Sequence, residues 1–596
     1  MPPSIYSSSL FRGKRTGAVR GTDNRCVIIF FGIAFLGVAV ILRLFFLMVI
    51  ETGFYTALAK GSQEMYTKLV PERGEIFMQD SRSKEEFPLA INKDFFLVYA
   101  DTRLIKNDET AKDISEKIAP IFSYTEEKKM ALFTKLNKRT DPYEPIEQKI
   151  EESVMEKIKE LKLPGVAFAR RSYRYYPEGM LGAQVVGFVG KNDKGEDIGR
   201  YGIEGYWQEQ LAGQGGFVEG IRNAKGGWIS SAGRSFEPAV DGADIVLTID
   251  RSLQYTACKA LKEGAIEYEA TSGALIIMDP HTGAIRAMCS WPYFDPNDYT
   301  KVTSADVYNN ANIFTPYEPG SVFKPIAMSA ALNEGLVNPN TPFFDSGRRD
   351  GVCQKPIQNA GNKSHGNQTM TGVLEYSINT GMVYIAELLG KHRFKKYIEL
   401  FGFGVKEGIQ LDTENTGTIA SLSENKKEFD CYTATASFGQ GITVTPLQMV
   451  TAYGALANGG TLMKPYIVDA LKEQNGKITK TNPTELKTVL TSRVSSLISG
   501  MMVSVVDSQY GGRARVAGYH VAGKSGTAQI SGIGGYSEDF NHTFVGFGPV
   551  EDPKYVLLVK YEKPKRVYAE STAAPVFGKV SKFILEYYGV PPNRTP

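Results

Sequence analysis

The chain has 596 residues, of which 42% are hydrophobic and 22% are charged, and its formal net charge is +3. A chain of this length is too long for one hydrophobic core and predicts about three or four domains, while the balanced charge gives no reason to expect nucleic-acid binding. The five cysteines and five histidines do not show the spacing of zinc ligands. No metal or cofactor is therefore expected, and the wide cysteine spacing does not indicate a disulfide framework.

The N-terminus combines a basic segment with a long apolar one. Residues 1–25 are polar and basic, and residues 26–50 are apolar apart from Arg43. As a helix, the apolar segment spans about 37 Å, enough to cross a bilayer. The basic flank predicts a cytoplasmic tail at 1–25 and an outward-facing remainder. An uncleaved anchor at 26–50 is favoured over a signal peptide cleaved near Ala57-Leu58-Ala59, because the apolar run is too long for the latter.

A mixed module is expected over residues 51–245. Its central part carries helical patterns rich in Lys and Glu, followed by short segments punctuated by glycine. Charge runs of this kind indicate solvated helix faces. The predicted helices are Thr110–Ile121, Thr125–Leu136 and Glu147–Leu161. Nothing in this region indicates catalysis, so it is interpreted as a spacer or docking module, a pedestal for the rest of the chain.

A second domain is expected over residues 246–590, with a short tail at 591–596. A strand-like run at 242–250 leads into a helical pattern at 253–267. Two apolar runs then flank a Pro/Gly turn at 279–283, which predicts a hairpin. Two further strands and a closing helix are expected at 542–550, 555–561 and 576–588. Early and late strands with helices between them predict an α+β domain whose sheet joins distant parts of the chain.

The most informative stretch for chemistry is centred on Ser321. Pro319-Gly320 breaks the chain just before an almost entirely apolar helical run, which places Ser321 at the N-terminus of a buried helix and Lys324 one turn away. A serine with an amine in reach is an arrangement for making an acyl-serine. The same Ser-x-x-Lys pattern also occurs at Ser81 and Ser423, but there it lies in charged surroundings typical of solvated loops.

Two further short motifs follow Ser321 in the chain. Ser377-Ile378-Asn379 follows a loop and a short helical stretch at 370–376, and Lys524-Ser525-Gly526-Thr527 follows a run at 519–523 that is typical of an edge strand. Each motif alone is weak. The order Ser-x-x-Lys, Ser-x-Asn, Lys-Ser-Gly is characteristic of penicillin-binding proteins and class A β-lactamases.

With these motifs the chain resembles the class B penicillin-binding proteins, which are peptidoglycan D,D-transpeptidases. The resemblance covers most of residues 26–590. It departs from the family pattern at Phe77–Ser81, which weakens any transfer of contacts made by that part of the module, and at Ile378, where a small residue is usual. Supporting stretches are Arg73-Gly74-Glu75-Ile76, Arg174-Tyr175-Tyr176-Pro177, Asp279-Pro280-His281-Thr282-Gly283, Phe438-Gly439-Gln440-Gly441, Val444-Thr445-Pro446-Leu447-Gln448 and Ala457-Asn458-Gly459-Gly460.

The resemblance implies a fold and a site. The fold would be multidomain α+β: one transmembrane helix, a mixed α/β pedestal of the dimerisation type, and a transpeptidase domain with an antiparallel sheet flanked by helices. Ser321 would attack the D-Ala-D-Ala bond of a stem peptide, with Lys324 as base, Ser377 as proton relay and Asn379 as an orienting group. The backbone N–H groups of Ser321 and Thr527 would form the oxyanion hole, and Lys524, Ser525, Gly526 and Thr527 would bind the carboxylate of the substrate or of a β-lactam.

The resemblance also implies a location and partners. The chain would lie in the bacterial cytoplasmic membrane with its N-terminus inside and its catalytic domain outside. A membrane glycosyltransferase would be its partner, contacted by Arg43 and residues 55–100, and the stretch Phe438–Gln448 favours the cell-division branch. Two alternatives remain open: a β-lactam sensor or hydrolase on the same fold, and an inactive cell-wall scaffold. A catalytic role for His365 is disfavoured, since a lone loop histidine is usually a solvated residue.

Overall fold

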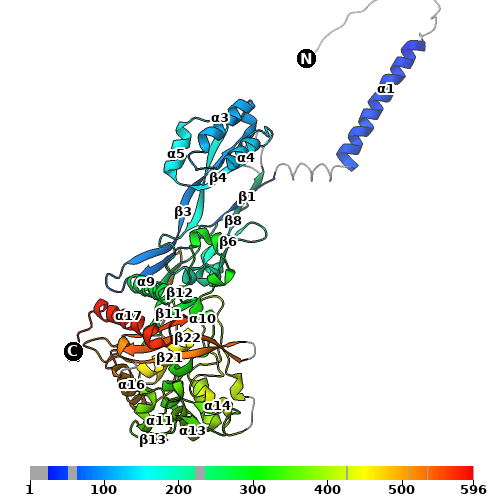
Figure 1. The fold of residues 1–596 in the computed structure, drawn as a ribbon. Coiled ribbons are helices and arrows are strands. Elements are labelled where there is room, and N and C mark those ends of the chain that lie inside the picture. Colours follow the sequence, from blue (N-terminus) through cyan, green and yellow to red (C-terminus); the bar gives the residue numbers. More distant parts are fainter. Residues whose placement is uncertain are drawn as a thin grey trace, which may run out of the picture. The chain divides into compact units, whose positions relative to one another are not determined.

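The computed structural model describes residues 24–50, 64–221, 235–423, 427–508, 511–532 and 535–594 (Figure 1). The chain divides into two compact units, Met1–Val70 with Gly215–Ala239 and Pro71–Gln214 with Val240–Pro596. All but the last two residues of the expected cytoplasmic tail, and the stretch Ala57-Leu58-Ala59, lie outside the described residues.

The first unit contains one long apolar helix and a small sheet. Helix α1 (Asn24–Phe45) continues into a π-helical turn (Phe46–Ile50). Within the described residues, the stretch Ile29–Val49 is the one long and apolar enough to cross a membrane, and none of it is buried against protein. An apolar helix without protein cover is typical of a single membrane-spanning anchor rather than of a core helix. The sheet is antiparallel: β1 (Glu64–Leu69), β8 (Gly216–Ile221) and β9 (Ser235–Glu237).

The second unit begins with a seven-stranded mixed sheet. Strand β10 (Asp244–Asp250) pairs parallel with β2 (Ile76–Gln79) and antiparallel with β18 (Val468–Lys472), so the expected boundary after residue 245 falls inside a strand shared by both parts. Its other strands are β3 (Glu86–Ala100), β4 (Glu144–Ile150), β5 (Val166–Tyr175) and β19 (Ile478–Lys480), and its helices are α3 (Asp108–Ile118), α4 (Glu126–Leu136) and α5 (Glu152–Glu160).

One predicted helix of this module is partly wrong. Residues 147–150 belong to strand β4, and the helix begins only at Glu152. Ile150 pairs with Phe96 of β3 and is 5% exposed. Pairing with β3 thus overrides the local charge pattern, which suited a helix.

A buried carboxylate holds the two arginine motifs of this module together. Glu204 is fully buried and accepts hydrogen bonds from Arg73 Nε and Arg174 Nε, each at 2.7 Å. Burial alone would raise the pKa of Glu204, but the two guanidinium groups outweigh it and lower that pKa. The stretches that begin at Arg73 and Arg174 are therefore joined through one acid that is distant from both in sequence.

The part of the second unit that contains the three motifs is built on a five-stranded antiparallel sheet, in the order β12-β11-β23-β22-β21. This confirms the predicted hairpin and a sheet assembled from distant parts of the chain. Its strands are β11 (Ser272–Met278), β12 (Ile285–Trp291), β21 (Ala522–Gly532), β22 (Gly535–Gly548) and β23 (Tyr555–Glu562).

Helices cover both faces of this sheet (Figure 1). On one face α9 (Arg251–Glu267) and α17 (Ala573–Tyr587) share a core with the strands, for example between Leu261, Val559 and Phe577. On the other face α15 (Pro446–Ala457) packs against β11 and β23, and α16 (Ser492–Asp507) packs against β21. The hydrophobic core on this other face includes most of α11 (Lys324–Asn333).

The remaining described elements complete this unit. The helices are α6 (Ala183–Val186), α7 (Gly202–Tyr206), α8 (Gln208–Ala212), α10 (Ala311–Phe314), α12 (Met370–Glu375), α13 (Asn379–Leu400) and α14 (Cys431–Ala436). The 3-10 turns are η2 (Thr102–Leu104), η3 (Pro296–Lys301), η4 (Ala305–Tyr308), η5 (Gly320–Phe323), η6 (Ala360–Asn362), η7 (Ala420–Ser423), η8 (Gly512–Ala514) and η9 (Ala569–Ser571). The remaining strands are β6 (Phe188–Lys191), β7 (Asp197–Arg200), β13 (Pro342–Asp345), β14 (Arg348–Arg349), β15 (Ile357–Gln358), β16 (Gly366–Thr369), β17 (Thr461–Met463) and β20 (Glu485–Thr488).

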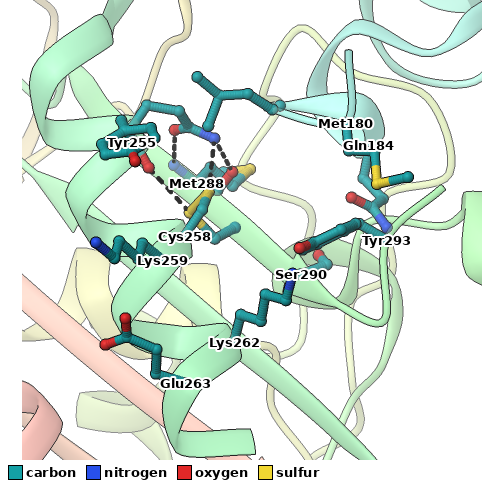
Figure 2. Close-up of a pocket in the computed structure, with 14 residues that line it drawn as sticks. Met180, Gln184, Tyr255, Cys258, Lys259, Lys262, Glu263, Met288, Ser290 and Tyr293 are labelled. Atoms are coloured by element: carbon teal, nitrogen blue, oxygen red, sulfur yellow. Dashed lines mark hydrogen bonds between the residues drawn. A yellow bond between two sulfur atoms is a disulfide. The ribbon is translucent and has the colours of Figure 1, made fainter. Parts of the chain in front are cut away.

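Two disulfides correct the sequence-based view that no disulfide framework was indicated. They join Cys258 to Cys289 and Cys353 to Cys431, which are 31 and 78 residues apart. Such separations carry no local signal, because only the tertiary fold brings the partners together. The first disulfide lies in the wall of a pocket of about 390 Å³, where Figure 2 labels Cys258. Gln254 also lines this pocket, and its side chain exchanges two 2.8 Å hydrogen bonds with the backbone of Met288.

Candidate active site

Ser321 lies in the 3-10 turn η5, immediately before helix α11, rather than in the α-helix itself. The turn is held by Gly320, whose backbone has φ +57° and whose N–H donates to Gly439 O at 2.9 Å. A Cβ at Gly320 would lie 2.8 Å from the Cβ of Ala528 on β21. Only glycine fits this left-handed conformation and close approach, which explains the Pro-Gly that precedes Ser321.

The residues that follow Ser321 are locked into the core. Val322 and Phe323 are fully buried, and the phenol of Tyr453 on α15 donates to Val322 O at 2.7 Å. Ser321 itself is partly exposed. The hydroxyl therefore stands on a rigid base at the edge of the core, a suitable position for a nucleophile.

The amine of Lys324 is completely buried and touches the second motif. Its Nζ is 2.5 Å from Ser377 O, 3.1 Å from Ser377 Oγ and 2.8 Å from Asn379 Oδ1. Burial lowers the pKa of Lys324 well below its ordinary value, and the charge of Lys524 lowers it further. A neutral amine has two N–H groups for the two carbonyl oxygens and one lone pair, which can accept a hydroxyl proton.

Ser377 is held in a strained backbone conformation. Its φ is +54°, in the left-handed region that residues with a Cβ rarely adopt. It links α12 to α13, and this geometry turns its carbonyl and its hydroxyl towards the same amine. Asn379 opens α13, and its amide Nδ2 donates to Gln358 O at 2.9 Å. Strain of this kind persists where surrounding contacts hold it, and it clusters at functional sites.

A buried carboxylate, missed by the sequence analysis, binds Thr380, the residue after Asn379, and the loop beside it. Asp345 at the end of β13 accepts hydrogen bonds from the hydroxyl of Thr380 at 2.6 Å, from Asn359 Nδ2 at 2.8 Å and from the backbone N–H of His365 at 2.9 Å. Burial alone would raise the pKa of Asp345, but these hydrogen bonds lower it overall. Asp345 thus binds the backbone of His365, while the ring of His365 lies 4.9 Å from the ring of Tyr376.

We expect Asp345→Ala to cost about 3 kcal/mol of stability, because it leaves several buried donors without an acceptor. The carboxylate is favoured in the folded state, so its contribution is present above the ordinary pKa of 3.8 and is lost as the pH falls below it. Urea unfolding would measure the loss. Asp350→Ala is the control, since that acid is exposed and pairs only with Arg348 in the described part of the chain; equal stability of the two variants would contradict the expectation.

The third motif lies in β21, the strand at the open end of the five-stranded sheet. Lys524 is 2% exposed, and its Nζ donates to Ser525 O at 3.0 Å. Burial lowers the pKa of Lys524 to about 8, and the charge of Glu570 opposes that shift. A Cβ at Gly526 would lie 3.0 Å from Val322 Cγ1 and 3.1 Å from Pro319 O, so glycine lets the strand pack directly against the turn that carries Ser321.

The other two Ser-x-x-Lys patterns have no comparable setting. Ser81 lies in a turn, where its backbone N–H donates to Asp250 Oδ2 at 2.8 Å. Ser423 is exposed in η7, and Lys426 lies outside the described residues. Fold context, rather than the pattern, distinguishes Ser321 from these two serines.

Comparisons with known proteins give a consistent result. A family model described as the penicillin-binding protein transpeptidase domain matches residues 273–582, and one for the penicillin-binding protein dimerisation domain matches residues 68–247. Stage V sporulation protein D of Bacillus subtilis is 35% identical over 550 residues, covering 90% of this chain and 82% of that protein. Peptidoglycan D,D-transpeptidase FtsI of Escherichia coli is 29% identical over 441 residues, which cover 73% of this chain and 71% of that protein. The crystal structure of penicillin-binding protein 3 from Mycobacterium tuberculosis with aztreonam has a TM-score of 0.67 at 23% identity, covering 89% and 98%.

Proposed function

This chain belongs to the class B penicillin-binding proteins, which are peptidoglycan D,D-transpeptidases acylated by β-lactams, and we propose that Ser321 is its nucleophile. The observation that carries the proposal is the buried amine of Lys324, which joins the first motif to the second through Ser377 and Asn379. A serine is a weak nucleophile unless a base takes its proton. Burial and the charge of Lys524 lower the pKa of Lys324, which favours the neutral amine that can act as this base.

The proposed acylation follows from these groups. Ser321 Oγ attacks the carbonyl carbon of the D-Ala-D-Ala bond while its proton passes to the neutral amine of Lys324. The C–N bond then breaks, and the leaving D-Ala amine receives a proton through the hydroxyl of Ser377. An amine from a second stem peptide then attacks the acyl carbon, the bond from this carbon to Ser321 Oγ breaks, and the proton lost by the amine returns to Ser321 Oγ, which leaves the cross-linked peptide and the free serine. Asn379 would orient Lys324 and the substrate amide.

The third motif would stabilise charge on the substrate. The oxyanion hole would consist of the backbone N–H groups of Ser321 and Thr527, and the packing of Gly526 on the nucleophile turn supports their proximity. Lys524, Ser525 and Thr527 would receive the terminal carboxylate, or that of a β-lactam. Ammonium and hydroxyl groups beside one another are donors suited to a carboxylate.

Location and partner complete the proposal. The apolar helix α1, together with the basic flank at residues 1–25, supports an anchor in the bacterial cytoplasmic membrane with the catalytic domain outside. Similarity to FtsI and to a sporulation protein supports a role in septal wall synthesis. A membrane glycosyltransferase is the proposed partner, with Arg43 and residues 55–100 as the contact region, of which residues 55–63 lie outside the described residues.

The function is tested by intact-mass analysis of the full-length chain in detergent after incubation with benzylpenicillin. A lasting single adduct that maps to Ser321, followed by cross-linking of stem peptides in an assay with lipid-linked substrate, is the expected result. Rapid drug turnover without an adduct would instead indicate a hydrolase. Absence of both adduct and turnover would favour an inactive scaffold.

A further inference from the structure

The proposed carboxylate-binding strand carries an acid of its own. The hydroxyl of Ser525 donates to Glu570 Oε1 at 2.7 Å. Glu570 lies in η9, the short turn between β23 and α17, which sequence analysis did not single out. The neighbouring backbone N–H of Ala569 donates to Thr527 Oγ1 at 3.1 Å. The turn η9 is thus attached to both hydroxyl residues of the third motif.

These two hydrogen bonds have opposite consequences for a ligand. A serine hydroxyl has a single hydrogen, and that of Ser525 is directed to Glu570. Thr527 uses an oxygen lone pair in its bond with Ala569, so its own hydrogen stays free to donate. A ligand carboxylate that binds this strand therefore finds the Thr527 hydroxyl available, and it must compete with Glu570 for the Ser525 hydroxyl.

The negative charge of Glu570 also weakens binding of a ligand carboxylate, as the competition for the Ser525 hydroxyl does. Glu570 is partly exposed, whereas the amine of Lys524 is almost completely buried. A ligand carboxylate on Ser525 would lie within a few ångströms of the negative charge of Glu570. The two like charges repel each other, and because the site is partly buried, solvent screens this repulsion only in part. Attraction to Lys524 is thereby reduced without being removed.

We propose that Glu570 is a specificity-determining residue, which competes with the ligand carboxylate for Ser525 and lowers the preference of the site for anionic ligands. The inference rests on the proposed function, because it requires the carboxylate to bind beside Ser321. In acyl transfer the D-Ala that leaves carries this carboxylate, and its departure empties the strand. If the strand binds the D-Ala carboxylate only weakly, D-Ala is released rather than attacking the acyl-serine again. The acyl-serine then reacts with the acceptor amine.

The test compares acylation of the full-length chain by benzylpenicillin and by its neutral methyl ester at pH 6.5, where Lys524 is protonated. In Glu570→Gln, which keeps the side-chain shape, we expect the acylation rate with the acid to rise roughly tenfold, equivalent to about 1.4 kcal/mol, and the rate with the ester to change less than twofold. Glu570→Asp keeps the charge and should keep the acid-to-ester ratio near that of the unmodified chain. Glu267→Gln removes an exposed acid from α9 and should change neither rate.

Each other outcome overturns the inference. If both rates change equally in Glu570→Gln, the acid affects the site by structure and not by charge. If Glu570→Gln and Glu570→Ala both lose folding, as judged by Tm, Glu570 is a structural residue. If the unmodified chain forms no adduct on Ser321 at all, the proposed function fails first, and the role of Glu570 fails with it.

Discussion

Replacing Ser321 by alanine is expected to abolish the lasting adduct with benzylpenicillin, a loss of more than about a thousandfold in acylation rate. The hydroxyl is the atom that forms the covalent bond, and no other group in the described site offers a hydroxyl on the same rigid turn. The fold should be unaffected, because Ser321 is partly exposed and the turn is held by Gly320 and by the buried Val322. Intact-mass analysis gives the adduct, and Tm gives the fold.

The chain supplies a matched control for this variant. Ser423 begins another Ser-x-x-Lys pattern and is exposed, so Ser423→Ala tests whether the pattern alone has reactivity. We expect Ser423→Ala to be acylated like the unmodified chain. An adduct that persists in Ser321→Ala, or that maps to a peptide containing Ser423, would disprove the assignment of the nucleophile.

Lys324→Gln is expected to reduce acylation by about a hundredfold or more, the usual contribution of a general base. Glutamine keeps N–H donors for Ser377 O and Asn379 Oδ1 but has no lone pair basic enough to take the Ser321 proton. In the unmodified chain the same reasoning predicts a pH dependence. Because burial lowers the pKa of Lys324, the neutral amine persists to unusually low pH, and acylation falls as the pH drops through that lowered value.

A variant of another buried lysine, Lys391, shows whether Lys324→Gln loses acylation through its chemistry or through lower stability. Lys391 on α13 pairs with Asp430 at 2.8 Å, and both side chains are largely buried. Lys391→Gln removes an amine from the same half of the molecule, so it should lower Tm while the folded fraction still forms the adduct on Ser321. If Lys324→Gln is acylated at the rate of Lys391→Gln, another group must be the base.

Sequence patterns alone predicted much of the architecture. Continuous apolar runs predicted the apolar helix α1, the hairpin of β11 and β12, and the strands β22 and β23, because each of these signals is contained in a short window. The apolar run after Ser321 likewise predicted a buried helix, which α11 confirms. The three motifs followed from their order along the chain, and they suggested one site without showing any contact.

Only the tertiary structure determined the contacts between residues that are distant in the chain. Strand β4 replaced part of a predicted helix because β3 offered it a partner. Both disulfides, the Asp345 hydrogen bonds and the contact of Ser525 with Glu570 join residues whose neighbours in sequence give no hint of the pairing. Local composition fixes which residues suit a helix, a strand or a turn. The pKa values of Lys324 and Lys524 depend instead on burial and on charges that only folding brings close, and neither is contained in a single stretch of sequence.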